Sequence, residues 1–155
     1  MEDEKQILNE AFISSVSEIS DMLRKITEGK TRPTLYITDN YILKNYSSDQ
    51  NYVNAIKSLI IMAGVGDVCI YSEGDEPGKN RNHSADLVAM QLDFNALDGR
   101  NVIFAHHQSH GRYWIVDDAG FMIDASPNGL MSGDPAIVKK LTKQEVKDIK
   151  SFYGI

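Results

Sequence analysis

The sequence contains only one cysteine, Cys69, so no intrachain disulfide can form. Small secreted domains usually depend on several disulfides, and this scarcity therefore favours a reducing compartment. The longest apolar run, residues 59–65, is far shorter than the roughly 20 residues that a membrane-spanning helix needs. The first residues are acidic, whereas a secretory signal peptide starts with basic ones. We expect a cytoplasmic protein without a membrane partner, or one exported by a route that needs no signal peptide.

Positive charge is also scarce, because 16 Lys and Arg stand against 22 Asp and Glu, which gives a net charge of −6. A negatively charged chain repels the nucleic-acid backbone unless its basic residues gather in one place. The densest basic group lies between residues 139 and 150, where lysines alternate with acidic residues as on a solvent-exposed helix. The charge distribution therefore predicts that nucleic acid is not a partner.

The amounts of apolar and charged residues are those of an ordinary globular protein, at 42% and 25%. A chain of 155 residues is long enough to bury a core without disulfides or a structural metal. We found no internal repeat and no low-complexity segment. These features predict one domain over residues 1–155.

Helices are predicted in three places. Apolar residues recur every three or four positions over residues 5–27, which indicates an amphipathic helix. Residues 52–63 indicate a second helix, for which Ser48 or Asp49 is a suitable N-cap. Thr142 and Glu145 have the spacing of a capping box, which predicts the start of a third helix.

Short apolar runs predict the strands. Residues 34–38 and 67–71 are rich in β-branched side chains. Three further runs, at residues 101–107, 112–117 and 121–125, are separated by turn-forming residues and predict an antiparallel β-meander. Helices flanking such a meander define an α+β fold.

Residues 84–94 fit two structures. Apolar residues recur at every second position, which favours a strand: Val88, Met90, Leu92 and Phe94. The alanine, leucine and methionine content, with Ser84 as a cap, favours a helix. We predict the strand on the basis of the alternation, and it would add a fourth strand to the meander.

His110 and Asp124 are the first candidates for chemistry. They flank one predicted hairpin, and side chains on adjacent antiparallel strands can meet. A carboxylate inside an apolar strand needs a polar partner, and it could hold an imidazole in one orientation. His106 and His107 precede His110, but successive strand side chains point to opposite faces, so we predict no metal site.

The order of these residues resembles that of the papain-like and transglutaminase-like cysteine enzymes. The resemblance covers residues 52–124, with a helix at 52–63, His110 before the aromatic run 113–116, and Asp124 closing the run 121–124. It implies a papain-like or transglutaminase-like core, of the kind found in effectors or toxins. The implied activity is hydrolysis, deamidation or acyl transfer on an amide or acyl group of a protein or peptide.

The position of the nucleophile departs from this family, because no cysteine precedes the helix at 52–63. Cys69 follows that helix and is the candidate nucleophile, with Ser48 and Ser84 as alternatives. His110 or His83 would be the general base, and Asp124 would orient it. Cys69 lies between two apolar residues, so a buried structural role is the competing interpretation.

A different function class fits the same composition. A non-catalytic, acidic protein-binding module, such as an immunity protein, inhibitor, adaptor or secretion chaperone, would use its net charge to attract a partner. The missing cysteine before the helix at 52–63 favours this alternative. Both functions imply a protein or peptide partner and no cofactor, and the sequence does not define the oligomeric state.

Overall fold

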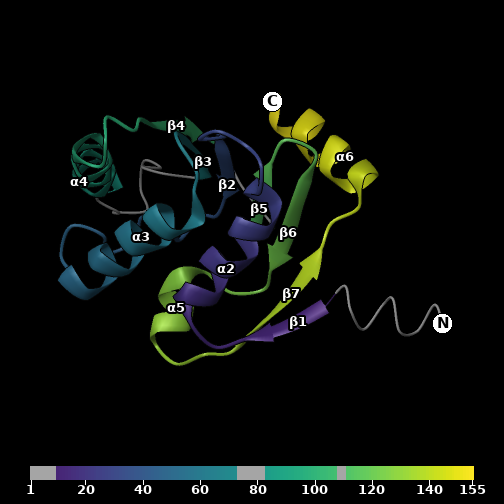
Figure 1. Ribbon diagram of the computed structural model, residues 1–155. Helices are drawn as coiled ribbons and strands as arrows, with labels where there is room; N and C mark the ends of the chain where they lie inside the picture. Colours follow the sequence, from purple (N-terminus) through teal and green to yellow (C-terminus); the bar gives the residue numbers. More distant parts are fainter. Residues whose placement is uncertain (1–9, 73–82, 108–110) are drawn as a thin grey trace.

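The computed structural model describes residues 10–72, 83–107 and 111–155, in which five helices surround one sheet of seven strands (Figure 1). The strands are β1 (Glu10–Ile13), β2 (Leu35–Thr38), β3 (Val68–Ser72), β4 (Val102–His106), β5 (Tyr113–Val116), β6 (Ala119–Ile123) and β7 (Ala136–Lys140). The helices are α2 (Val16–Thr27), α3 (Gln50–Ala63), α4 (His83–Ala96), α5 (Pro127–Met131) and α6 (Lys143–Tyr153). None of the helices in these ranges has the length and apolarity that crossing a bilayer requires.

The sheet has the strand order β1-β7-β6-β5-β2-β3-β4 and consists of two parts. β2, β3 and β4 are parallel and are connected through α3 and α4. β5, β6, β7 and β1 pair with antiparallel neighbours, and β5 joins the parallel part by pairing with β2. This mixed sheet with helices confirms the predicted α+β class.

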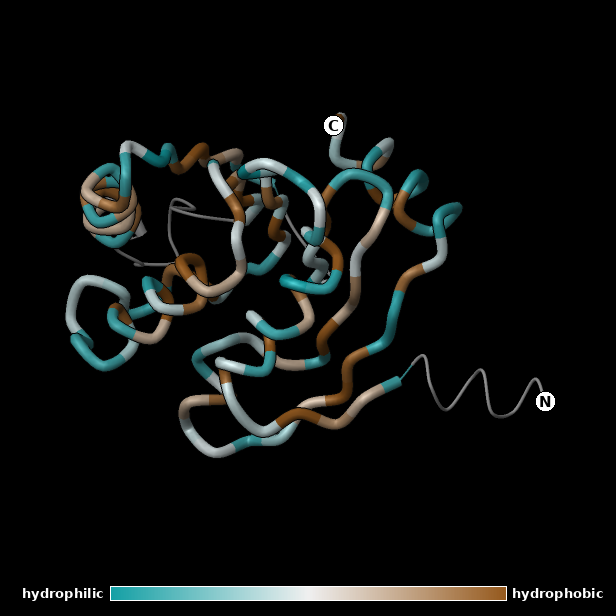
Figure 2. Tube along the Cα trace, viewed as in Figure 1, coloured by the Kyte–Doolittle hydropathy of each residue, from teal (hydrophilic) through white to brown (hydrophobic). Residues whose placement is uncertain are grey.

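Apolar side chains are buried on both faces of the sheet. The main core lies against α2 and α3 and contains Ile19, Leu23, Ile56 and Ile60. A smaller cluster on the other face places Val146 of α6 against strand residues. α6 is mostly hydrophilic along its length, as Figure 2 shows. This fits its position, because only a narrow stripe of the helix that includes Val146 is buried.

Local capping explains where two of the helices begin. The side chain of Asp49 accepts a hydrogen bond from the backbone N–H of Tyr52 at 3.2 Å, which confirms one of the two predicted caps of α3. Thr142 and Glu145 form the predicted capping box at the start of α6. Both interactions satisfy backbone donors that the first turn of a helix leaves free.

The predicted strand at residues 84–94 is wrong, because this segment belongs to helix α4. Met90 and Phe94, four residues apart, are each 1% exposed, whereas Val88 and Leu92 are 53% and 66% exposed. The buried stripe therefore follows the helical period. The alternation that indicated a strand combined the buried Met90 and Phe94 with Val88 and Leu92, which lie on the solvent side.

The four-stranded meander is also wrong. β4 pairs in parallel with β3 at the edge of the sheet, and it does not pair with β5. The antiparallel neighbours of β5 are β6 and β2, and β6 continues to β7, a strand that was not predicted. In the predicted helix at residues 5–27, the helix begins only at Val16, because residues 10–13 form β1 against β7.

Candidate functional site

Polar side chains gather at the carboxyl ends of the parallel strands. β2 ends at Thr38 and is followed by Asp39, and β3 ends at Ser72. Arg112 directly precedes β5, which is antiparallel to β2, so it lies at the same edge. Open α/β sheets bind their ligands in the crevice outside this edge. We therefore define Asp39, Arg112 and their contacts as the candidate site.

Asp39 has a fully buried side chain, with 0% of its surface exposed. Its Oδ1 accepts a hydrogen bond from the backbone N–H of Tyr41 at 2.8 Å. Its Oδ2 has no hydrogen-bond partner among the described residues. Burial raises the pKa of Asp39 to about 6, although two backbone N–H groups and the charge of Arg112 lower it. The carboxyl group therefore changes its charge just below neutral pH.

Arg112 lies beside this carboxyl group, with 30% of its side chain exposed and its Nε 3.9 Å from Oδ1 of Asp39. Its Nη1 donates one long hydrogen bond, at 3.5 Å, to the backbone oxygen of Asp124. The buried Nε has no hydrogen-bond acceptor within the described part of the chain. Since a guanidinium carries several N–H donors, Arg112 retains donors for a further ligand.

Tyr41 provides an aromatic surface next to this arginine. Its ring centre is 5.7 Å from the guanidinium carbon of Arg112, and 39% of the residue is exposed. The backbone of Tyr41 is held from two sides, since its N–H donates to Asp39 and its carbonyl accepts from the side chain of Asn128 at 2.7 Å. The turn after β2 therefore holds the aromatic ring close to the cation.

Asp124, a predicted site residue, reaches the same edge of the sheet. Its carboxylate Oδ1 accepts a hydrogen bond from the backbone N–H of Ile137 at 2.8 Å, and its backbone oxygen accepts from Arg112. The carboxylate thus stabilises the start of β7. The polar partner that we expected for Asp124 is a backbone amide of the neighbouring strand.

Cys69, the predicted nucleophile, lies inside β3, with Tyr36 of β2 and Ile103 of β4 on its two sides. It precedes Ser72, at the carboxyl end of the strand, by three positions, which corresponds to about 10 Å along a strand. Burial raises the pKa of its thiol, so the reactive thiolate is disfavoured.

Other predicted candidates are only partly covered by the structure. His110 and the side chains of His83 and Ser84 lie outside the described residues, so the structure does not test the predicted catalytic set of Cys69, His83, His110 and Asp124. The hydroxyl of Ser48 donates to the backbone oxygen of Asn45 at the turn before α3.

Two neighbouring histidines are placed by the structure. His107 packs against Phe152 and Tyr153 of α6, with ring centres 5.3 and 4.6 Å away. His106 is exposed at the end of β4. Within the described ranges, no three His, Cys, Asp or Glu side chains are close enough to hold a metal ion.

The chain was compared with known families, curated proteins and solved structures. No family model matches the chain, and no curated protein matches it. Among solved structures, the chain is similar to TrmBL2, an archaeal chromatin protein whose structure is described as showing a novel mode of DNA binding. The two share 13% sequence identity with a TM-score of 0.45, and the alignment covers 94% of this chain and 51% of TrmBL2. The chain thus spans about half the length of that protein.

This finding corrects the function predicted from the sequence. We predicted a papain-like or transglutaminase-like enzyme or, alternatively, a protein-binding module, and we excluded nucleic acid, whereas the similar structure is that of a DNA-binding protein. The enzyme, the protein-binding module and the exclusion of nucleic acid are therefore withdrawn. The burial of Cys69 is a physical reason against the enzyme, since its only thiol lies in the interior of a strand.

Proposed function

We propose that this chain binds a nucleotide unit, with the phosphate on Arg112 and the base against Tyr41. The observation that carries the proposal is the partly exposed guanidinium of Arg112, which lies at the carboxyl edge of the parallel strands and has donors without an acceptor among the described residues. Unused donors in a half-buried arginine are unfavourable unless a ligand or water accepts from them. An anion at this edge would accept these hydrogen bonds.

Phosphate suits the geometry of this arginine. The planar guanidinium can donate two parallel hydrogen bonds to a phosphate group, and such charge-assisted bonds are stronger than neutral ones. Asp39 is the only described carboxyl group within 4.0 Å of Arg112, and its raised pKa limits its negative charge near pH 6. A phosphate group at Arg112 is therefore repelled less by Asp39 than it would be by a fully ionised carboxylate.

The exposed ring of Tyr41 favours a nucleotide over a simple phosphate ion. Proteins that bind single-stranded nucleic acid combine basic side chains with aromatic rings on which bases stack. Here the ring and the guanidinium are 5.7 Å apart, which is close enough for one nucleotide to contact both.

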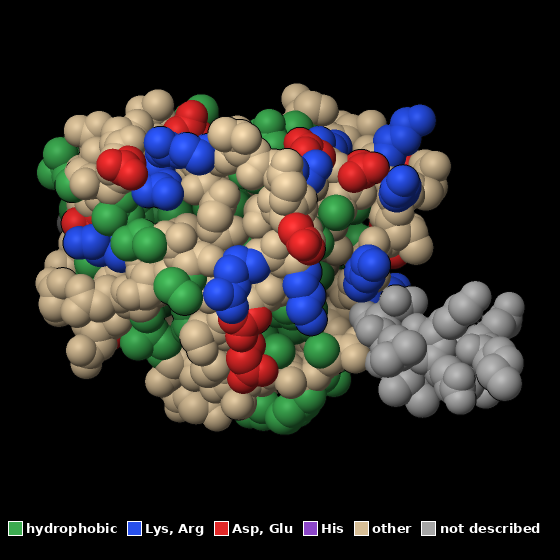
Figure 3. Space-filling view, viewed as in Figure 1, with side chains coloured by type: hydrophobic (Ala, Val, Ile, Leu, Met, Phe, Trp, Pro, Cys, Tyr) green, Lys and Arg blue, Asp and Glu red, His purple; other side chains and the backbone are tan. Residues whose placement is uncertain are grey.

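A free nucleotide and a single strand of nucleic acid would both offer a phosphate to Arg112 and a base to Tyr41. The net charge of −6 opposes a long polyanion, and acidic and basic side chains are mixed on the face shown in Figure 3. We therefore expect contact with one or two nucleotides, and measurable binding of short ligands.

The test is calorimetric titration at low salt with inorganic phosphate, adenosine monophosphate and a ten-nucleotide deoxythymidine strand. Arg112→Gln removes the cation and keeps a polar side chain of similar length. Arg24→Gln makes the same change of charge on an exposed residue of α2, whose only described partner is Asp21. Tyr41→Leu removes the aromatic ring while an apolar side chain remains.

We expect Arg112→Gln to weaken nucleotide binding about tenfold or more, as loss of a charge-assisted contact requires, and Arg24→Gln to leave it within about twofold. Tyr41→Leu should weaken the binding of adenosine monophosphate and of the deoxythymidine strand, but not the binding of inorganic phosphate. Equal losses in Arg112→Gln and Arg24→Gln, or no binding of any ligand at millimolar concentration, would refute the proposal.

A further inference from the structure

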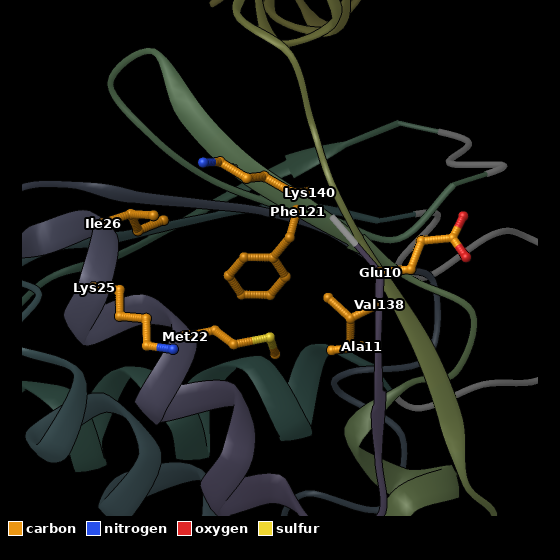
Figure 4. A pocket seen from close by; sticks show the side chains of 9 residues that line it. Glu10, Ala11, Met22, Lys25, Ile26, Phe121, Val138 and Lys140 are labelled. Carbon is orange, nitrogen blue, oxygen red and sulfur yellow. The ribbon is translucent and has the colours of Figure 1, made fainter. Parts of the chain in front are cut away.

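A hollow lies away from the candidate site, between helix α2 and the antiparallel part of the sheet. Its volume is about 300 Å³, at the lower end of the range of about 300–1,000 Å³ for ligand pockets. Its walls come from α2, β1, β6 and β7 (Figure 4). β7 begins at the edge of the candidate site and ends at Lys140, so this pocket lies toward the opposite edge.

The floor of the pocket is apolar. Phe121 of β6 and Val138 of β7 are 4% and 3% exposed, and their side chains face α2. Met22 and Ile26, one helical turn apart on α2, form the opposite wall. Ala11 pairs with Val138 across β1 and β7, and its small side chain leaves the space open.

Two lysines lie at the mouth of this apolar hollow. Lys25 comes from α2 between Met22 and Ile26, and Lys140 pairs with Phe121 in the register of β6 and β7 (Figure 4). Lys140 continues the inward row of Ala136 and Val138, where an apolar residue would be expected. Its stem can lie along the floor while its ammonium reaches the mouth, as lysines do at such boundaries.

The charges of these two lysines are unpaired in the described structure, in contrast to those of their neighbours. Arg24 pairs with Asp21, and Lys139 lies 3.6 Å from Glu145. Glu10 also lines the pocket, but Figure 4 shows its carboxylate turned away from the hollow. Basic side chains therefore border apolar surface over α2 and β7, as Figure 3 also shows.

We infer that this pocket binds a small amphiphilic anion, whose apolar body lies on Phe121 and Val138 and whose acidic head lies between Lys25 and Lys140. Burial of the apolar body would supply affinity, at roughly 25 cal/mol for each Å² removed from water. The two ammonium groups would select an anion over a neutral or cationic molecule of equal length. This site is independent of the nucleotide site, and neither proposal requires the other.

The test uses octanoate as the probe, with butyrate as a short anion and octyltrimethylammonium as a cation of similar apolar length. Binding is followed by calorimetry for every variant. In the wild type and the lysine variant it is also followed by the fluorescence of Trp114, the only tryptophan of these two proteins, which stacks on Phe121 with ring centres 6.4 Å apart. The variant Lys25→Gln/Lys140→Gln removes the charges. Ala11→Trp fills the pocket, and Phe12→Trp introduces the same side chain at the next position, which is 69% exposed and points to the opposite face.

We expect octanoate to bind in preference to both other probes. The double lysine variant should weaken octanoate binding about tenfold. Ala11→Trp should abolish octanoate binding, whereas Phe12→Trp should leave it intact. Octanoate binding that is unchanged in Ala11→Trp, equal binding of octyltrimethylammonium, or no octanoate binding would overturn the inference. A lower molecular mass of Ala11→Trp than of the wild type in solution would instead identify the pocket as an interface with a second copy, and would also overturn it.

Discussion

Asp39 and Arg112 lie 3.9 Å apart at the edge of the sheet, yet the carboxyl group keeps a pKa of about 6. An arginine at this distance usually lowers the pKa of a carboxyl group. The full burial of Asp39 outweighs that effect, because an ionised carboxylate loses its hydration there. This relationship leads to predictions for both stability and binding.

Asp39→Asn should change how stability depends on pH. The pKa of Asp39 is higher in the folded state than the ordinary 3.8, so its stabilising contribution is complete below about pH 4 and is lost as the pH rises to about 6. Asparagine cannot ionise and keeps an oxygen for the N–H of Tyr41. The variant should therefore gain stability relative to the wild type over this interval, by up to roughly 3 kcal/mol. Urea denaturation between pH 4 and pH 7 measures the difference.

Asp98→Asn is the matched control for this change, because Asp98 is exposed and asparagine tolerates its positive φ of 67°. The gain in stability of Asp39→Asn between pH 4 and pH 7 should exceed any change that Asp98→Asn shows over the same range. Parallel curves for Asp39→Asn and the wild type would show that Asp39 titrates normally.

Nucleotide binding should strengthen as the pH falls through 6, because a neutral Asp39 leaves the charge of Arg112 free for the phosphate. A thymidine dinucleotide is the suitable ligand, since its phosphodiester does not titrate in this range. The affinity at pH 7.5 should be lower by up to roughly thirtyfold than at low pH, the ratio of ionised to neutral carboxyl for a pKa of about 6. Asp39→Asn should bind equally at both pH values, and a pH dependence that persists in this variant would assign it to another group.

Thr142→Ala should weaken the start of α6. The hydroxyl of Thr142 accepts a hydrogen bond from the N–H of Glu145 at 3.1 Å, and the carboxylate of Glu145 accepts from the N–H of Thr142 at 2.9 Å. Loss of such a cap costs about 1 kcal/mol, or roughly 2–4 °C in Tm for a domain of this size. Thr31→Ala, in an exposed turn, is the control for calorimetry, and an equal Tm in the two variants would show that the cap contributes little.

The elements predicted correctly are those whose signals are local. The caps Asp49 and Thr142 satisfy backbone donors within one turn, and β2 and β3 are short β-branched runs. The pairing of β4 with β3 and of β1 with β7 joins segments that are distant in the sequence, so local patterns did not reveal it. The error at α4 arose because its exposed side carries apolar residues, which disguised the helical period.

The site was predicted only in part, for a similar reason. Asp124 was recognised as a carboxylate in an apolar strand, and it does lie at the edge of the sheet beside Arg112. Asp39 was missed, although a carboxylate directly after the apolar run 34–38 is a signal for the carboxyl end of a strand. That Asp39 meets Arg112 depends on the pairing of β2 with β5, which the predicted meander did not contain.

Cys69 should react slowly with a thiol reagent in the folded protein. It is 9% exposed, it lies between two paired strands, and burial raises the pKa of its thiol, so both access and thiolate content are reduced. We expect reaction with a disulfide reagent at pH 8 to be at least about tenfold slower than in denaturant. Cys69→Ala/Ser151→Cys places a thiol on the exposed side of α6 and provides the rate of an accessible group. If Cys69 reacts as fast as this variant in the folded state, the strand opens readily around the thiol, and burial does not control its chemistry.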